Sequence, residues 1–236
     1  GALGVNVGGT TANKVIWSSL DFERSLGTFL LGENFMAKFD ILEDLKWRGA
    51  INQETDEEGL RKYLAEHDDL ALYCGTDPTG DSLHIGHLIP FMILKRFQMA
   101  GYHPVILIGG GTGAIGDPSG RKTERTLQTA EQVKHNEEKL TAQMKKLFGT
   151  ENFEIRNNAE WLGKMNLLDF LRDYGKFFQV NNMINKDVVA SRLENGISFT
   201  EFSYQILQAI DFYHLNKDNG VQMQIGGSCL LYTSPS

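Results

Sequence analysis

The sequence predicts an α/β fold in which helices flank an open parallel sheet, and three observations support this prediction. Short apolar runs typical of buried parallel strands occur at 70–73 and 104–109, and an alternating run follows at 221–225. Each run leads directly into a glycine-rich loop or a polar cluster, and stretches with helical periodicity separate the runs. Because parallel strands end at one edge of a sheet, we expect a crevice lined by these polar residues.

Length and composition limit the possible functions. The 236 residues can bury one good-sized core, and 41% hydrophobic with 22% charged residues is the composition of an ordinary soluble globular protein. No apolar run approaches the roughly 20 residues of a membrane span, so we expect no membrane partner. Cys74 and Cys229 lack metal-ligand spacing, which favours a reducing cytoplasm and no metal site. A net charge of −7 argues against nucleic-acid binding over the whole surface.

Residues 1–35 do not match the rest of the chain. The segment from Gly1 to Lys14 is rich in Gly, Thr and Asn and has no periodic apolar face, and the first methionine is Met36. We therefore expect residues 1–35 to be an appended or mistranslated leader that is disordered. The alternative is a short amphipathic arm that packs on the body of the protein.

Two helical segments are predicted before the first strand. Ile41, Leu42 and Leu45 recur at helix spacing. Thr55 and Glu58 then form a capping box that opens a second amphipathic helix.

The most informative stretch begins at Tyr73. The first strand leads into a loop with several glycines, after which Asp81 or Ser82 is placed to cap a helix that continues to about Gly101. A strand, a glycine loop and a helix N-terminus in this order direct unpaired N–H groups and the positive end of the helix dipole at one position. Such a position suits a phosphate group.

Two histidines lie at the start of that helix. His84 and His87 are three residues apart and project from one face, and Gly86 between them lets a flat ring approach the backbone. A histidine pair at a helix start often marks only a solvated end. The strand, the loop and the intervening glycine favour a binding site here.

The loop after the second strand contains a misleading pattern. Gly111, Gly113 and Gly116 satisfy a dinucleotide fingerprint. The helix required by that fingerprint would have to pass through Pro118 and Gly120, which disfavour it. A nicotinamide-dependent oxidoreductase is therefore a minor alternative.

Capping boxes predict both long helices of the second half. Thr129 and Gln132 open a helix whose lysines we expect to face solvent, and Ser198 and Glu201 open another. Between these helices, a short strand and two helical stretches are predicted at 153–156, 161–174 and 182–194.

The last helix carries a polar stripe. Tyr204, Gln208 and Asp211 lie at i, i+4 and i+7, on one face of an otherwise apolar helix. Such a stripe is usually solvated, and a binding surface is the alternative.

The segment His84-Ile85-Gly86-His87 resembles the HIGH signature of class I aminoacyl-tRNA synthetases. With residues 73–79, Tyr-Cys-Gly-Thr-Asp-Pro-Thr, it more narrowly resembles the tyrosyl-tRNA synthetases of bacteria. The resemblance extends over about 36–228, and it implies a Rossmann-like, nucleotide-binding catalytic domain. The implied reaction of protein biosynthesis joins L-tyrosine and ATP into tyrosyl-adenylate, releases pyrophosphate, and transfers the tyrosyl group to tRNA(Tyr). The sister tryptophanyl-tRNA synthetase is the principal alternative.

The resemblance implies that ATP is a substrate, with Mg²⁺ bound through its phosphates. His84 and Thr79 correspond to residues that contact the γ-phosphate, and Arg121 and Arg125 correspond to residues that move toward pyrophosphate. The implied ATP-binding residues are Cys74, Gly75, Asp77, His84, Gly86 and His87, and the implied catalytic residues are Thr79, His84, His87, Arg121 and Arg125.

The resemblance also implies a tyrosine pocket. A phenol hydroxyl both donates and accepts a hydrogen bond, so it needs one buried partner of each kind, and Tyr73 and Asp211 correspond to these partners. Phenylalanine would leave both partners unpaired, a form of discrimination for which tyrosyl-tRNA synthetases are the standard case. The other implied tyrosine-binding residues are Asp117, Tyr204 and Gln208 at the ammonium group, Asp77 between the two substrates, and Asn158 and Gln224 in a second layer.

The resemblance ends at Ser228. The family continues with an Asp-Gln-Trp-Gly segment, whereas Cys229 follows here. We expect an incomplete domain with an unrelated tail at 229–236, and little activity from the chain alone, since the mobile lysine loop and the tRNA-binding domains come later in the family. Full-length members are expected to form homodimers.

Overall fold

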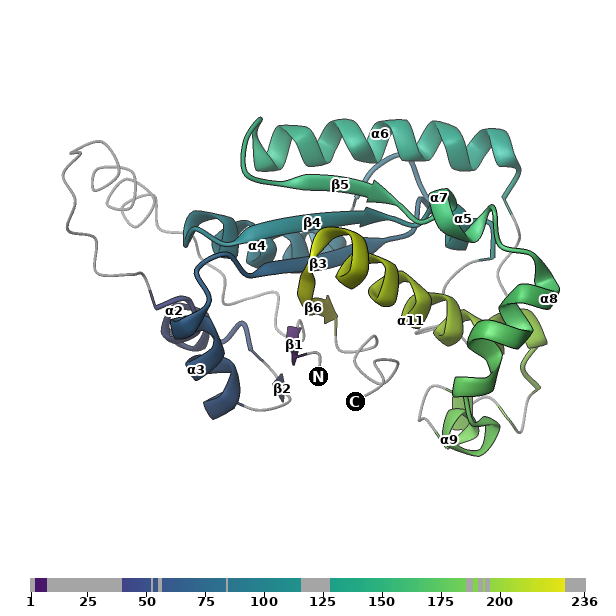
Figure 1. Cartoon of the computed structure of the whole chain (residues 1–236). Helices are drawn as coiled ribbons and strands as arrows, with labels where there is room; N and C mark the ends of the chain where they lie inside the picture. Colours follow the sequence, from purple (N-terminus) through teal and green to yellow (C-terminus); the bar gives the residue numbers. More distant parts are fainter. Residues whose placement is uncertain are drawn as a thin grey trace.

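A single sheet organises the computed structural model, which describes residues 3–7, 40–51, 53–54, 57–83, 85–115, 128–185, 189–190, 193 and 196–227. Within these residues six strands pair in the order β2-β1-β6-β3-β4-β5, and helices cover both faces (Figure 1). The strands are β1 (Leu3–Val7), β2 (Gln53–Glu54), β3 (Ala71–Thr76), β4 (His103–Ile108), β5 (Glu154–Asn157) and β6 (Val221–Gly227). All neighbouring strands are parallel except β1 and β2, so the predicted open parallel sheet is confirmed.

The helices connect the strands in the predicted alternation. They are α2 (Ile41–Trp47), α3 (Glu57–Glu66), α4 (Ile85–Met99), α5 (Gly110–Gly113), α6 (Ala130–Phe148), α7 (Ala159–Leu162), α8 (Leu167–Asp169), α9 (Val180–Ile184) and α11 (Phe199–Asn219), with a π-helical turn at Phe170–Tyr174 and a 3₁₀ turn at Gly175–Phe177. Within the described residues no helix is long and apolar enough to cross a membrane.

The strand order reverses at β3. From β3 the chain adds β4 and β5 on one side, and then returns through α11 to place β6 on the other side of β3. In open α/β sheets, ligands bind outside the carboxyl ends of the strands at such a reversal. The topology therefore predicts a ligand site at the carboxyl end of β3.

Alternating side chains of β3 divide the core into two layers. Leu72 and Cys74 point to the face covered by α2, α3, α4 and α6, where Leu94 and Met144 are fully buried. Tyr73 points to the opposite face, which α7 and α11 cover. Consecutive residues of one strand thus serve different sides of the sheet.

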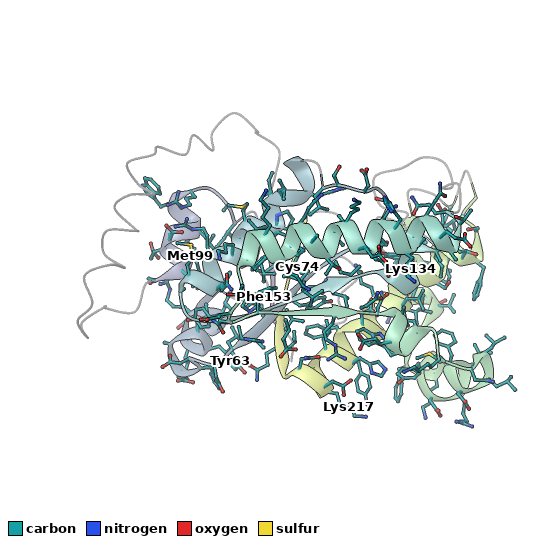
Figure 2. The ribbon with its side chains drawn as sticks, turned by 90° about the horizontal axis from the view of Figure 1, so that it is seen from above. Tyr63, Cys74, Met99, Lys134, Phe153 and Lys217 are labelled. Carbon is teal, nitrogen blue, oxygen red and sulfur yellow. The ribbon has the colours of Figure 1, made fainter. Side chains whose placement is uncertain are left out.

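Two of the predicted helix caps form. Both hydrogen bonds of the Thr129–Gln132 capping box form at the start of α6, and Ser198 caps α11 by accepting the Glu201 N–H at 3.2 Å. Figure 2 shows α6 lying across the sheet with Lys134 on it. Lys134, like the other lysines of this helix, is exposed as expected.

The predicted start of α4 is wrong. Neither Asp81 nor Ser82 begins the helix, whose first residue is Ile85. The Leu83 N–H instead donates to Gln143 Oε1 at 3.2 Å, and Gln143 Nε2 donates to the Asp81 carbonyl at 3.3 Å. A side chain from α6 therefore holds this segment outside the helix.

One segment of the expected leader lies within the described residues. Leu3–Val7 form β1, which pairs in parallel with β6 and places Val5 opposite Ile225. The unpaired backbone groups along a strand edge accept any extended segment that reaches them, and Leu, Val and Val alternate here as in a strand. The rest of the segment up to residue 39, Cys229 and the remaining tail lie outside the described residues.

Candidate active site

A cavity of about 290 Å³ opens where the sheet order reverses, at the carboxyl ends of β3 and β4. The first turns of α4 and the middle of α11 form its walls. Its volume is at the lower end of the range for small-molecule sites, about 300–1,000 Å³. It is lined by Tyr73, Cys74, Gly75, Thr76, Asp77, Thr79, Gly86, His87, Pro90, Phe91, Leu107, Gly109, Thr112, Asn158, Tyr204, Gln208, Asp211, Gln224 and Ile225.

Tyr73 presents a buried hydroxyl on the α11 side of this cavity. Its side chain is 1% exposed, stacks on Phe212 at 5.6 Å between ring centroids, and lies beside Gln224 in the sheet register. The Tyr73 hydroxyl makes no hydrogen bond within the described residues. An unpaired buried hydroxyl costs about 1–3 kcal/mol, so a bound group that pairs with it recovers free energy.

Asp211 faces the same space with its carboxylate held from two sides. Asn158 Nδ2 donates to Oδ2 at 2.9 Å, and Trp161 Nε1 donates to Oδ1 at 2.8 Å. Burial, together with the nearby charge of Asp77, raises the pKa of Asp211 to about 7, although these two hydrogen bonds act to lower it. The carboxyl group is thus oriented by its neighbours and costly to ionise.

The pKa of Tyr73 is raised well above its ordinary value, first by burial and then by the nearby charge of Asp211. The phenol therefore keeps its proton at neutral pH. Tyr73 and Asp211 interact electrostatically across the cavity, one with a fixed proton and the other with carboxylate oxygens. This combination can both donate to and accept from a single hydroxyl.

A hydrogen-bonded chain joins this end of the cavity to Asp77. Asn158 Nδ2 also donates to Thr112 Oγ1 at 2.9 Å, and Thr112 Oγ1 donates to Asp77 Oδ1 at 2.6 Å. The Tyr204 hydroxyl donates to Asp77 Oδ2 at 2.7 Å. Thr112 and Asn158 are 2% and 0% exposed, so two carboxylates on different elements are linked through buried polar groups.

The glycines after β4 are required by close packing. A Cβ on Gly109 would collide with the Asp77 carboxylate, and one on Gly113 would lie 2.7 Å from Pro78 Cδ. The segment forms only the four-residue helix α5. The glycine pattern that suggested a dinucleotide site is therefore explained, for Gly111 and Gly113, by the contacts of this loop, since a Cβ on Gly111 would crowd Asn158.

Comparisons with known proteins agree with this geometry. Residues 65–228 match the family described as tRNA synthetases class I (W and Y). The chain belongs to this family. Among curated synthetases, the tyrosine–tRNA ligase of Lactobacillus helveticus is 95% identical over 193 residues, which are 82% of this chain and 46% of that protein. The ligase of Lactobacillus delbrueckii subsp. bulgaricus (strain ATCC BAA-365 / Lb-18) is 86% identical with the same coverage. The chain thus spans about half the length of these relatives.

Solved synthetase structures support the Rossmann-like fold. A C-terminally truncated mitochondrial tyrosyl-tRNA synthetase from Aspergillus nidulans superposes with a TM-score of 0.69 at 34% identity, covering 80% of this chain and 57% of that one. Tryptophanyl-tRNA synthetase from Plasmodium falciparum superposes with a TM-score of 0.58 at 17% identity, covering 86% and 57%, and shows the shared fold alone.

The cavity brings together every described residue that the synthetase resemblance had implied. Those residues are Tyr73, Cys74, Gly75, Asp77, Thr79, Gly86, His87, Asn158, Tyr204, Gln208, Asp211 and Gln224. His84, Asp117, Arg121 and Arg125 lie outside the described residues, so their assignments stay predictions. Burial raises the pKa of Cys74 to about 12, which leaves its thiol protonated and unsuited to act as a nucleophile.

Hydrogen bonds hold the loop between β3 and α4 against α6. Asn136 Nδ2 donates to the Pro78 carbonyl at 2.9 Å, and Gln128 Nε2 donates to the Thr79 carbonyl at 3.0 Å. Beyond this loop, Gly86 and His87 present the first turns of α4 to the cavity. The strand, loop and helix start thus meet there, as the phosphate hypothesis requires.

Two residues of the network were missed from the sequence. Thr112 lies within the glycine loop, where only its position after a strand hinted at a role. Trp161 lies three residues after Asn158, and this helical spacing was the available signal. Within the described residues no group of three His, Cys, Asp or Glu side chains is arranged to bind a metal ion.

Proposed function

We propose that this chain carries the tyrosine-activating site of a tyrosine–tRNA ligase. In the proposed reaction the carboxylate of L-tyrosine attacks the α-phosphate of ATP to give tyrosyl-adenylate and pyrophosphate, and the tyrosyl group then passes to tRNA(Tyr). The observation that carries the proposal is that one cavity presents both the Tyr73 hydroxyl, which is unpaired within the described residues, and the Asp211 carboxylate.

We propose one orientation for tyrosine in the cavity. Tyr73, whose raised pKa keeps it protonated, donates to the phenol oxygen, and Asp211 accepts the phenol proton. Tyr204 lies about 10 Å from Asp211 along α11, given the helical rise of about 1.5 Å per residue, and Gln208 lies between them. The stripe thus supplies polar groups at both ends of the amino acid, with the ammonium group held by Tyr204, Gln208 and, by resemblance, Asp117.

ATP is proposed to lie at the start of α4. Gly75 and Asp77 at the end of β3, Thr79 in the loop, and Gly86 and His87 in the first turns of α4 line that side. Catalysis here consists of positioning and of stabilising charge on the phosphates. By resemblance, His84 and Thr79 contact the γ-phosphate, and Arg121 and Arg125 provide the cations that move toward pyrophosphate. No described carboxylate cluster suits Mg²⁺, which we propose is held through the phosphates.

Two further parts of the proposal concern partners. Besides tRNA(Tyr), we propose a second copy of the protein, because large apolar side chains are exposed at Leu167, Leu168, Phe177 and Phe199, at 68%, 73%, 74% and 75%. Two of them, Leu167 and Phe199, line one surface hollow, and a contiguous apolar patch is characteristic of an interface. We also propose a cytoplasmic location.

Isothermal titration calorimetry of the chain with L-tyrosine, L-phenylalanine and L-tryptophan tests the proposal. Tyrosine is expected to bind and phenylalanine to bind at least tenfold more weakly, because it leaves two buried groups unpaired. A preference for tryptophan, or binding of NADH without ATP, would contradict the proposal. For a longer protein containing this chain, tyrosine-dependent exchange of labelled pyrophosphate into ATP is the corresponding assay.

A further inference from the structure

Trp161 is held by Asp211, which lines the cavity, and by two residues that lie outside it. Its indole N–H donates to Asp211, and its ring stacks on His214 with 5.4 Å between centroids and 14° between planes. The guanidinium carbon of Arg156 lies 5.7 Å from the same ring centroid. Trp161 is 8% exposed and does not line the cavity, so any effect on a ligand passes through Asp211.

The geometry of α11 makes this arrangement possible. Asp211 and His214 are three residues apart and therefore lie on one face of the helix. A flat indole packed along that face meets the carboxylate with its N–H and the imidazole with its ring. His214 is held from the π-helical turn, since its Nε2 lies 3.4 Å from the Tyr174 hydroxyl. Within α11 its Nδ1 lies 3.8 Å from Asp218 Oδ2.

Arg156 is fixed just as firmly. It hydrogen bonds to Asn219 at the end of α11 and to Glu160 Oε2 at 3.1 Å. These contacts tie β5 to α7 and α11 and keep the guanidinium near the indole. A cation near an aromatic face is attracted by the ring quadrupole.

We propose that His214 and Arg156 are positioning residues for tyrosine selectivity, an inference that rests on the proposed function. Two donors orient the Asp211 carboxylate, and one of them, Asn158, is fixed by three hydrogen bonds. The other is the Trp161 N–H, whose direction depends on the plane of its ring. His214 and Arg156 set that plane, and through it the oxygen that accepts the phenol proton.

Replacement of His214 separates stacking from other roles. His214→Ala removes the ring and is expected to lower the tyrosine-to-phenylalanine affinity ratio about tenfold, as when one hydrogen bond to a charged group is weakened. His214→Phe keeps a flat ring and is expected to restore most of the ratio. Calorimetry measures both affinities, and the ¹H–¹⁵N indole signal of Trp161, assigned with Trp161→Phe, reports its hydrogen bond without any ligand.

The control is His135→Ala, which removes an exposed histidine on α6. It is expected to change neither the ratio nor the indole signal. The inference would be overturned if His214→Ala lowered the affinities for tyrosine and phenylalanine equally and left the indole signal unmoved. That result would indicate a purely structural role for His214. A wild-type chain without tyrosine preference would instead count against the proposed function, and a moved indole signal would still support the positioning of Trp161.

Discussion

The two ends of the cavity are built in opposite ways. At the end proposed to bind tyrosine, Tyr73, Asn158 and Asp211 are 1%, 0% and 3% exposed and held by neighbouring side chains. At the end proposed to bind the nucleotide, Gly86 and His87 are exposed and start a helix. A neutral hydroxyl is distinguished only by rigid, desolvated partners, whereas phosphate groups are bound by backbone N–H groups and charge that water can still reach. Substitutions at the first end should therefore alter stability and selectivity together, and those at the second should not.

The largest expected effect is a pH-dependent stability difference at Asp211. Its folded pKa of about 7 is raised from 3.8, so the folded state keeps a proton that the unfolded state loses as pH rises. Relative to Asp211→Asn, the wild type should lose about 4 kcal/mol of unfolding free energy between pH 4 and pH 8. Urea denaturation of both proteins at several pH values measures this difference. If the stability difference between the two proteins did not change with pH, burial would not raise the pKa of Asp211.

Tyr73→Phe should change stability and tyrosine affinity in opposite directions. The substitution removes a buried hydroxyl without a partner, so we expect the unfolding free energy to rise by about 1–3 kcal/mol, while tyrosine affinity falls about tenfold. The matched control is Tyr102→Phe, because the Tyr102 hydroxyl donates to the Leu64 carbonyl at 3.1 Å. That substitution should lower stability by about 1 kcal/mol. Thermal melts measure the stability of both variants. If both substitutions change the unfolding free energy in the same direction, the prediction is contradicted.

Thr112→Val tests whether the two ends are coupled. Valine keeps the shape but removes the hydroxyl that receives from Asn158 and donates to Asp77. We expect a loss of about 1–2 kcal/mol in stability. In a double-mutant cycle with Tyr204→Phe, the two changes should not be additive, since both act on Asp77. Additive losses would mean that the chain of hydrogen bonds carries no coupling.

The features of the fold and of the candidate site that the sequence predicts are those whose interacting residues lie close together along the chain. The strands 70–73 and 104–109 and the Thr129–Gln132 capping box are encoded within a few residues, and they formed as predicted. The start of α4 was missed because Gln143, 60 residues away, decides it. Trp161 was missed for the same reason, since its partner Asp211 is 50 residues distant.

The pairing of β1 with β6 could not be predicted either. The open edge of a sheet can pair with any extended segment that lies close to it, and the sequence does not show which segment does. The polar stripe on α11 shows the intermediate case. Its spacing was visible in the sequence, but a solvated face and a binding face have the same pattern. In the structure Asp211 is 3% exposed and accepts hydrogen bonds from Asn158 and Trp161, so this part of the stripe is not a solvated face.

The smallest expected effect is that of His87→Ala at the nucleotide end. Because His87 is exposed, its removal should change the unfolding free energy by no more than about 0.5 kcal/mol. Tyrosine affinity should stay within about twofold, since Tyr73 and Asp211 belong to the opposite layer of the sheet, and only nucleotide affinity should fall. Parallel titrations with tyrosine and ATP measure the two affinities. A comparable loss of both would mean that the nucleotide end is as tightly built as the tyrosine end, because a local change would then spread across β3.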